Sequence, residues 1–228
     1  MFHLGVIKAL SDQGLLPHVL TCSSAGSIIA AMTGTRTDAE LPEIFDAGNL
    51  SLRAFQKVGL RNALSSGALL DPAQLEDCLM RNIRAGSFLE AFERTRRILG
   101  VTVSPAQPNQ APRLLDYLTA PPVAVRRAVL ASCAVPGVFP PVMLEALDYG
   151  GQAVPYMRSN RWIDGSLSND LPLLQLARLH NVNHYIVSQT NPHIVPFMRE
   201  QDRHYPRGHA RRRARHRPDQ RGSAALQW

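Results

Sequence analysis

The chain has 228 residues, of which 45% are hydrophobic, and it carries a formal net charge of +7. This length and composition fit one globular domain with a sizeable buried core. Nine arginines and three acidic residues fall within residues 199–228, so six of the seven net charges belong to that end. The rest of the chain is close to neutral, which argues against a nucleic-acid-binding domain.

The three cysteines, Cys22, Cys78 and Cys133, are widely spaced and odd in number. This pattern argues against a disulfide framework and against a zinc site, and we expect neither a metal nor a cofactor. The apolar runs are shorter than the roughly 18 residues that can span a bilayer, and no basic-then-apolar leader precedes the first element. The expected location is therefore cytoplasmic, or peripheral at a membrane.

The first elements alternate between helix and strand. Apolar residues recur at helical spacing in residues 1–13, and Gly14 suits the end of that helix. Residues 19–22 have the pattern of a buried strand, and residues 27–33 continue as an apolar helix behind a tight turn. Short connections of this kind are typical of an α/β protein with a mainly parallel sheet.

The later elements are predicted by the same patterns. Helices are expected at residues 38–47, 71–81, 87–94, 123–134 and 169–180. Strands are expected at residues 97–103 and 184–189, and loops at residues 104–112 and 149–160.

Two stretches are expected to lie outside the regular elements. Residues 138–144 contain the pair Pro140-Pro141, which removes two ladder donors and excludes a central strand. The apolar periodicity stops after Phe197, so residues 199–228 are predicted to be a disordered, arginine-rich tail.

Ser24 stands at the turn between the strand 19–22 and the helix 27–33. A serine at such a turn projects its hydroxyl above the sheet edge, and the first N–H groups of the helix point towards it. This is the geometry of a nucleophile elbow, whose usual pattern is G-x-S-x-G. The chain instead reads Cys22-Ser23-Ser24-Ala25-Gly26, so the first glycine is missing. A structural turn with a capping serine is the alternative.

Four stretches occur in a fixed order, namely His3-Leu4-Gly5-Val6, Ser23-Ser24-Ala25-Gly26-Ser27, residues 131–141 and Trp162-Ile163-Asp164-Gly165-Ser166. Together they resemble the patatin-like phospholipases and acylhydrolases, in particular the branch that includes triacylglycerol lipases and bacterial patatin-like proteins. The resemblance implies a three-layer α/β fold over residues 1–198, with a mainly parallel central sheet flanked by helices.

The resemblance also implies a Ser–Asp dyad. Ser24 matches the nucleophile of the family, and Asp164 matches the aspartate of its Asp-Gly motif. The chemistry is intelligible because a carboxylate within hydrogen-bond reach can take the proton of an attacking hydroxyl. Gly165 would then form the sharp turn that aims the carboxylate. A turn aspartate without catalytic function is the alternative for Asp164.

Members of this family carry a glycine-rich loop just before the helix with which this chain begins, and a first strand before that loop. The backbone N–H groups of the loop form the oxyanion hole. We therefore expect a domain that is incomplete at its N-terminus and lacks these oxyanion donors.

The resemblance implies a lipid acyl ester as substrate, either a phospholipid or a glyceride. Val138, Phe139 and Met143 lie in a proline-bounded apolar stretch and are candidates for lining an acyl channel, with a place in the core as the alternative.

Two other functions stay open at this point. One is an α/β-hydrolase-type esterase with Ser24, Asp164 and either His184 or His193. The other is a catalytically impaired patatin-like module that binds lipid or protein.

Overall fold

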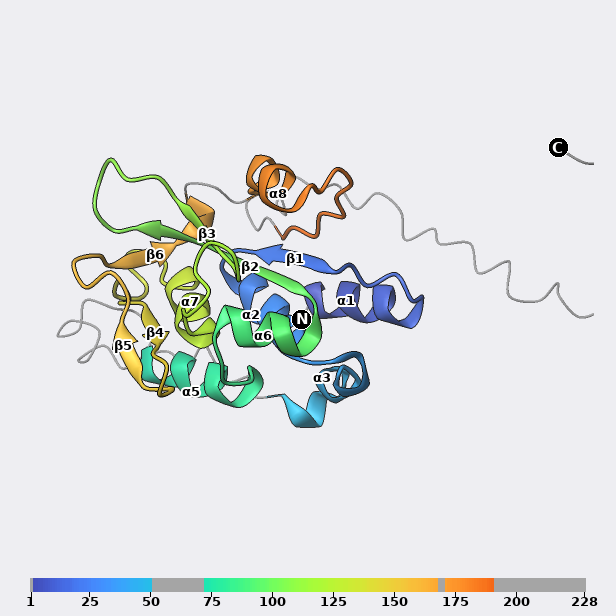
Figure 1. The fold of residues 1–228 in the computed structure, drawn as a ribbon. Coiled ribbons are helices and arrows are strands. Elements are labelled where there is room, and N and C mark those ends of the chain that lie inside the picture. Colours follow the sequence, from blue (N-terminus) through green and yellow to red (C-terminus); the bar gives the residue numbers. More distant parts are fainter. Residues whose placement is uncertain (1, 51–71, 168–170, 191–228) are drawn as a thin grey trace, which may run out of the picture. The chain divides into compact units, whose positions relative to one another are not determined.

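A computed structural model describes residues 2–50, 72–167 and 171–190 (Figure 1). The described residues up to residue 188 form one compact unit. The tail predicted at residues 199–228, and the domain boundary before it, lie outside the described residues. The α-helices are α1 (Phe2–Asp12), α2 (Ala25–Gly34), α3 (Pro42–Phe45), α5 (Pro72–Asn82), α6 (Phe88–Thr95), α7 (Val125–Ser132) and α8 (Leu173–His180). The strands are β1 (Val19–Cys22), β2 (Ile98–Pro105), β3 (Arg113–Leu115), β4 (Glu145–Leu147), β5 (Ala153–Pro155) and β6 (Trp162–Asp164), and the 3-10 helices are η1 (Asp38–Glu40), η2 (Ala47–Asn49) and η3 (Gly165–Leu167).

β2 is the central strand of the main sheet. β1 pairs with its first half in parallel, whereas β3 and β6 pair with its second half in antiparallel orientation. The sheet is therefore mixed, and its longest ladder, between β1 and β2, is parallel. β4 and β5 form a separate antiparallel hairpin.

The register of β2 shows which strands share an edge. Val101 pairs with Cys22 of β1 and with Leu115 of β3, so β1 and β3 lie on opposite edges. Val103 pairs with residues of both β3 and β6, so these two strands also lie on opposite edges. β1 and β6 therefore share one edge of β2. Because they run in opposite directions, their C-terminal ends face each other.

Helices flank the sheet. Figure 1 shows α2, α6 and α7 below the main sheet and α8 above it. α7 packs against β2, and most of this helix is buried, since each of residues 128–132 is a buried residue. On the other side of the sheet (Figure 1), Nε2 of His180 in α8 lies 2.8 Å from Oδ2 of Asp116, the residue that follows β3. The α/β class expected from the sequence is confirmed.

Most predicted elements are present with small differences at their ends. The helices expected at residues 1–13, 71–81, 87–94 and 123–134 are α1, α5, α6 and α7, and the strands expected at residues 19–22 and 97–103 are β1 and β2. The short strands β3, β4 and β5 were not expected, and β5 falls in a predicted loop. Strands of three residues are too short to show an alternating pattern.

Three predictions need correction. The helix expected at residues 38–47 is broken, because η1 ends before Pro42 and α3 begins there. The helix expected at residues 169–180 begins only at Leu173, and residues 168–170 lie outside the described residues. The strand expected at residues 184–189 is wrong, since this segment is irregular and Ile186 is 67% exposed. The Tyr185 hydroxyl holds the segment against α8 by donating to the Leu173 carbonyl.

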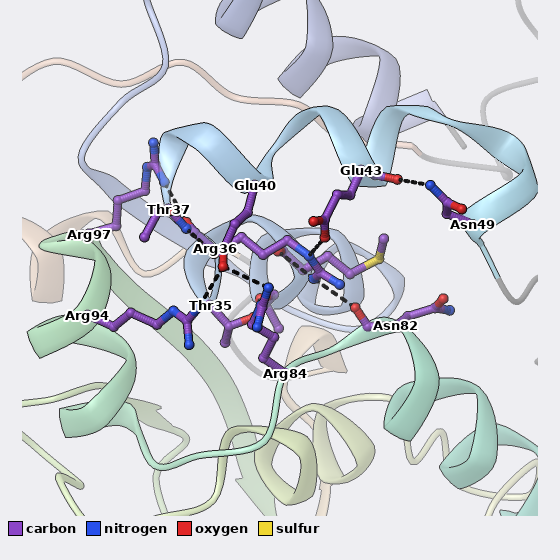
Figure 2. Close-up of polar contacts among 12 residues, drawn as sticks. Thr35, Arg36, Thr37, Glu40, Glu43, Asn49, Asn82, Arg84, Arg94 and Arg97 are labelled. Carbon is purple, nitrogen blue, oxygen red and sulfur yellow. Dashed lines mark hydrogen bonds and ion pairs between the residues drawn. The ribbon is translucent and has the colours of Figure 1, made fainter.

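A charged network holds the C-terminal end of α2 (Figure 2). Arg36, just after α2, donates to the carbonyl oxygen of Asn82 at the end of α5. Glu40 of η1 accepts hydrogen bonds from Arg84 at 2.7 Å and from Arg94 of α6 at 2.5 Å. The network therefore fixes α2 against its neighbours at the end remote from the predicted elbow.

Candidate active site

Ser24 joins β1 to α2 in a strained backbone conformation. Its φ is 51° and its ψ is −135°. A positive φ is uncommon for a residue other than glycine and costs about 1–3 kcal/mol, so it persists only where the surroundings impose it. The Ser24 side chain makes no capping hydrogen bond to α2, so the structure does not support the alternative of a capping serine.

Asp164 lies at the end of β6 that faces the end of β1. Its partner on β2 is Val103, and the partner of Cys22 is Val101. These partners are two residues apart, which corresponds to about 7 Å along a strand. Since Ser24 follows Cys22 by two residues, the structure brings the Ser24 turn and the Asp164 turn together at one point on the edge of β2.

Asp164 is buried, with 1% of its surface exposed. Its backbone N–H donates to the Ala134 carbonyl oxygen at 3.1 Å, and its Oδ1 accepts a hydrogen bond from the Ser166 N–H at 2.9 Å. This second bond is a local turn contact, as the alternative for Asp164 expects. The same bond also fixes the orientation of the carboxylate.

Gly165 packs directly on the central strand. A Cβ at this position would overlap the carbonyl oxygen of Thr102, and its φ is not in the left-handed region. The sequence predicts a sharp turn as the reason for a glycine at this position. The structure gives close approach to β2 as the reason instead.

Buried side chains hold both backbone groups of Ser24. The Ser27 hydroxyl donates to the Ser24 carbonyl oxygen at 2.6 Å, and the Cys133 thiol donates to the same oxygen at 3.4 Å. The Ser24 N–H donates to Ser132 Oγ at 3.0 Å. The sequence alone predicts no role for these three side chains. Residues 131–141 match a family motif, but the motif does not show which residues they contact. A hydrogen bond between residues 108 positions apart leaves no pattern in the local sequence.

The Cys133 thiol is buried beside the elbow. Burial raises the pKa of Cys133 to about 12, and the negative charge of Asp164 acts in the same direction, whereas the hydrogen bond with Ser27 opposes the rise. The thiol therefore stays protonated at neutral pH and remains a donor to the Ser24 carbonyl.

The other residues of the predicted elbow surround Ser24. Cys22 and Ser23 are half-buried, and Ala25 is exposed at the first position of α2. A Cβ on Gly26 would lie 3.5 Å from the Cys22 Cβ, which is an ordinary van der Waals contact. The Cys22 side chain thus lies beside Gly26. Residues 22 and 26 are the two positions that are glycines in the usual pattern.

The candidates for an acyl channel are distributed between core and surface. Phe139 is 6% exposed and belongs to the buried core, against which Val138 packs. Met143 is half-buried. The exposed His184 contacts the side-chain oxygen of Asn183 at 2.7 Å, and residue 193 lies outside the described residues.

Other features of the described residues lie away from Ser24. A cavity of about 370 Å³ is found beyond the opposite end of α2, lined by Arg36, Glu43, Ile44, Asn49, Leu50 and Asn82. Within residues 2–50, 72–167 and 171–190, no group of three His, Cys, Asp or Glu side chains is placed to hold a metal ion. No helix in this part of the chain combines the length and the apolar character needed to cross a membrane.

Comparison with known proteins gives the family. The sequence model of the patatin-like phospholipases matches residues 1–177. A triacylglycerol lipase of Arabidopsis thaliana, SDP1L, is 41% identical over 215 residues, which cover 87% of this chain and 27% of the relative. The triacylglycerol lipase ptl2 of Schizosaccharomyces pombe is 37% identical over 203 residues, covering 86% of this chain and 32% of the relative.

A patatin-like phospholipase domain-containing protein of Aspergillus niger is 40% identical over 201 residues, covering 86% of this chain and 27% of the relative. The chain therefore belongs to the patatin-like phospholipase family, as the sequence motifs indicate. It spans between a quarter and a third of the length of these curated relatives.

Proposed function

We propose that this chain is a serine hydrolase that cleaves fatty-acyl esters of lipids, with Ser24 as its nucleophile and Asp164 as its general base. The observation that carries the proposal is the strained φ of 51° at Ser24, at the point where the ends of β1 and β6 meet. Family membership, and relatives named as triacylglycerol lipases, support a lipid ester as the substrate class.

In the proposed reaction, Asp164 accepts the hydroxyl proton of Ser24 while Ser24 Oγ attacks the ester carbonyl carbon. The Ser166 N–H bond at Asp164 Oδ1 leaves Oδ2 as the oxygen that we assign to this proton. Asp164 then gives this proton to the leaving oxygen, which departs as the alcohol. A water molecule hydrolyses the acyl-enzyme that remains. The N–H groups at the start of α2, beginning with Ala25, and the dipole of this helix would stabilise the oxyanion.

The proposed acyl site uses the apolar stretch after α7, where Phe139 forms part of the core and Val138 packs against it. Val138 and Met143 are half-buried, so these two side chains are the ones available to an acyl chain. Hydrolysis of p-nitrophenyl esters should then be faster for long than for short acyl groups. Equal rates would contradict an acyl site here.

The dyad is tested by covalent labelling with a fluorophosphonate probe and by hydrolysis of p-nitrophenyl esters, phospholipid and triacylglycerol. We expect the probe to modify Ser24, as read by mass spectrometry of tryptic peptides, and we expect Ser24→Ala to abolish both labelling and hydrolysis. Asp164→Asn should reduce kcat by about 100-fold or more, since the general base is lost. Thermal unfolding of each variant shows that the fold is retained.

Two outcomes would favour the other functions. His184→Ala and His193→Ala should keep their activity, and loss of activity in either would favour an esterase with a Ser–Asp–His triad. A wild-type chain that binds phospholipid vesicles without being labelled at Ser24 would instead indicate a binding module.

A further inference from the structure

Ser132, the last residue of α7, is fully buried and joins the elbow to the central strand. Its Oγ accepts the hydrogen bond from the Ser24 N–H at 3.0 Å and donates to the Thr102 carbonyl oxygen at 2.8 Å. A hydroxyl has one proton and two lone pairs, so it can make both bonds at once. One side chain therefore links the backbone of Ser24 to the middle of β2.

The same Thr102 carbonyl is the contact point of the Asp164 turn, because Gly165 packs against this oxygen so closely that a Cβ would overlap it. Thr102 also lies between the partner of Cys22 and the partner of Asp164 in the register of β2. Both halves of the proposed dyad are thus positioned against the same peptide group of the central strand.

We infer that Ser132 is a positioning residue, which holds the Ser24 amide so that the Ser24 hydroxyl points towards Asp164. The inference rests on the proposed function. A residue with φ of 51° keeps this conformation only when its surroundings impose it. Ser27 and Cys133 hold the carbonyl group of Ser24, and Ser132 holds its N–H group. Without the Ser132 hydroxyl, the N–H group loses its partner and is free to turn with the strained backbone.

The first test compares Ser132→Ala with Ser132→Thr, which keeps the hydroxyl. We expect Ser132→Ala to lower kcat for p-nitrophenyl esters by about 10- to 100-fold with little change in KM, because a small displacement of the nucleophile mainly affects the chemical step. Ser132→Thr should recover most of the lost kcat.

Ser87→Ala is the matched control. Ser87 is also buried, and its Oγ accepts a backbone hydrogen bond from Glu90 at 3.2 Å, but it caps α6. This variant should lower Tm and keep the wild-type kcat. A fall in kcat as large as that of Ser132→Ala, at the same loss of Tm, would mean that reduced stability explains the effect, and would overturn the inference.

The second test does not depend on activity. Hydrogen exchange of the Ser24 amide, followed by NMR, should be slow in the wild type, faster by about tenfold or more in Ser132→Ala, and slow again in Ser132→Thr. Unchanged exchange in Ser132→Ala would overturn the inference. A protected Ser24 amide in a wild-type chain that the fluorophosphonate probe does not label would instead contradict the proposed function alone.

Discussion

At the scale of single residues, the candidate site is built from small side chains under close contact. Ser24 is held by two serines and a cysteine, and the turn after Asp164 is held by a glycine that touches the central strand. Small residues allow β1, β6 and α7 to approach one another at this point. An added methyl group should therefore lower the stability of the fold at a crowded position of the site, and should not lower it where only ordinary contacts are made.

Gly165 and Gly26 provide the clearest contrast. Gly165→Ala places a Cβ against backbone atoms of Thr102, and we expect a loss of about 1–3 kcal/mol in the free energy of unfolding. Gly26→Ala meets only an ordinary contact with Cys22 and lies in α2, so we expect no loss, or a gain of up to about 1 kcal/mol. Urea denaturation measures both values. Similar losses in the two variants would contradict the close packing of Gly165 on β2.

Cys133 should be chemically inert in the folded chain. Burial raises its pKa to about 12, so the thiolate that reacts with alkylating agents is scarce at pH 8, and burial restricts the access of reagents as well. We expect iodoacetamide to leave Cys133 unmodified at pH 8, as read by mass spectrometry, and to modify it in urea. Rapid alkylation of the folded chain would show that the thiol is not buried beside Ser24.

At the scale of elements, α2 connects the candidate site to the charged network of Figure 2. The N-terminal end of α2 follows Ser24, and its C-terminal end leads into Arg36. Arg97, just before β2, forms an ion pair with Asp38 of η1, and Glu40 connects the same 3-10 helix to two further arginines. The orientation of the helix that begins at the elbow is therefore supported from its far end.

Glu40 makes the stability of this network depend on pH. The N–H of Thr37, together with the Thr37 hydroxyl and the Arg94 and Arg84 guanidinium groups, lowers the pKa of Glu40 from 4.5 to about 2. Because the pKa in the folded chain is the lower one, the ionised carboxylate stabilises the fold above about pH 4.5. This contribution is lost as the pH falls towards 2.

The comparison of wild type with Glu40→Gln tests this dependence. We expect the variant to have a lower Tm at pH 7, and the difference in Tm to shrink steadily between pH 4.5 and pH 2. Glu93→Gln, at an exposed position of α6, serves as the control and should leave Tm unchanged. A difference in Tm for Glu40→Gln that persists at pH 2 would show that lost packing, and not lost charge, explains the effect.

At the scale of the whole molecule, the local patterns predicted most of the longer elements. Helical periodicity and end signals located α1, α5, α6 and α7, and a run of β-branched residues located β2. The short strands β3 and β5 carry no such pattern. The strand predicted at residues 184–189 has a suitable composition, but composition does not provide a neighbouring strand with which to form a ladder.

Short motifs and periodicity in the sequence are enough to indicate the family, the α/β class and the candidate residues Ser24 and Asp164. Two further features are visible only in the folded chain: β6 meets β1 end to end on the same edge of β2, and Ser132 joins Ser24 to Thr102. These features depend on register and on contacts between residues more than a hundred positions apart. Such contacts form only when the sheet and α7 are packed together, so no local stretch of sequence records them.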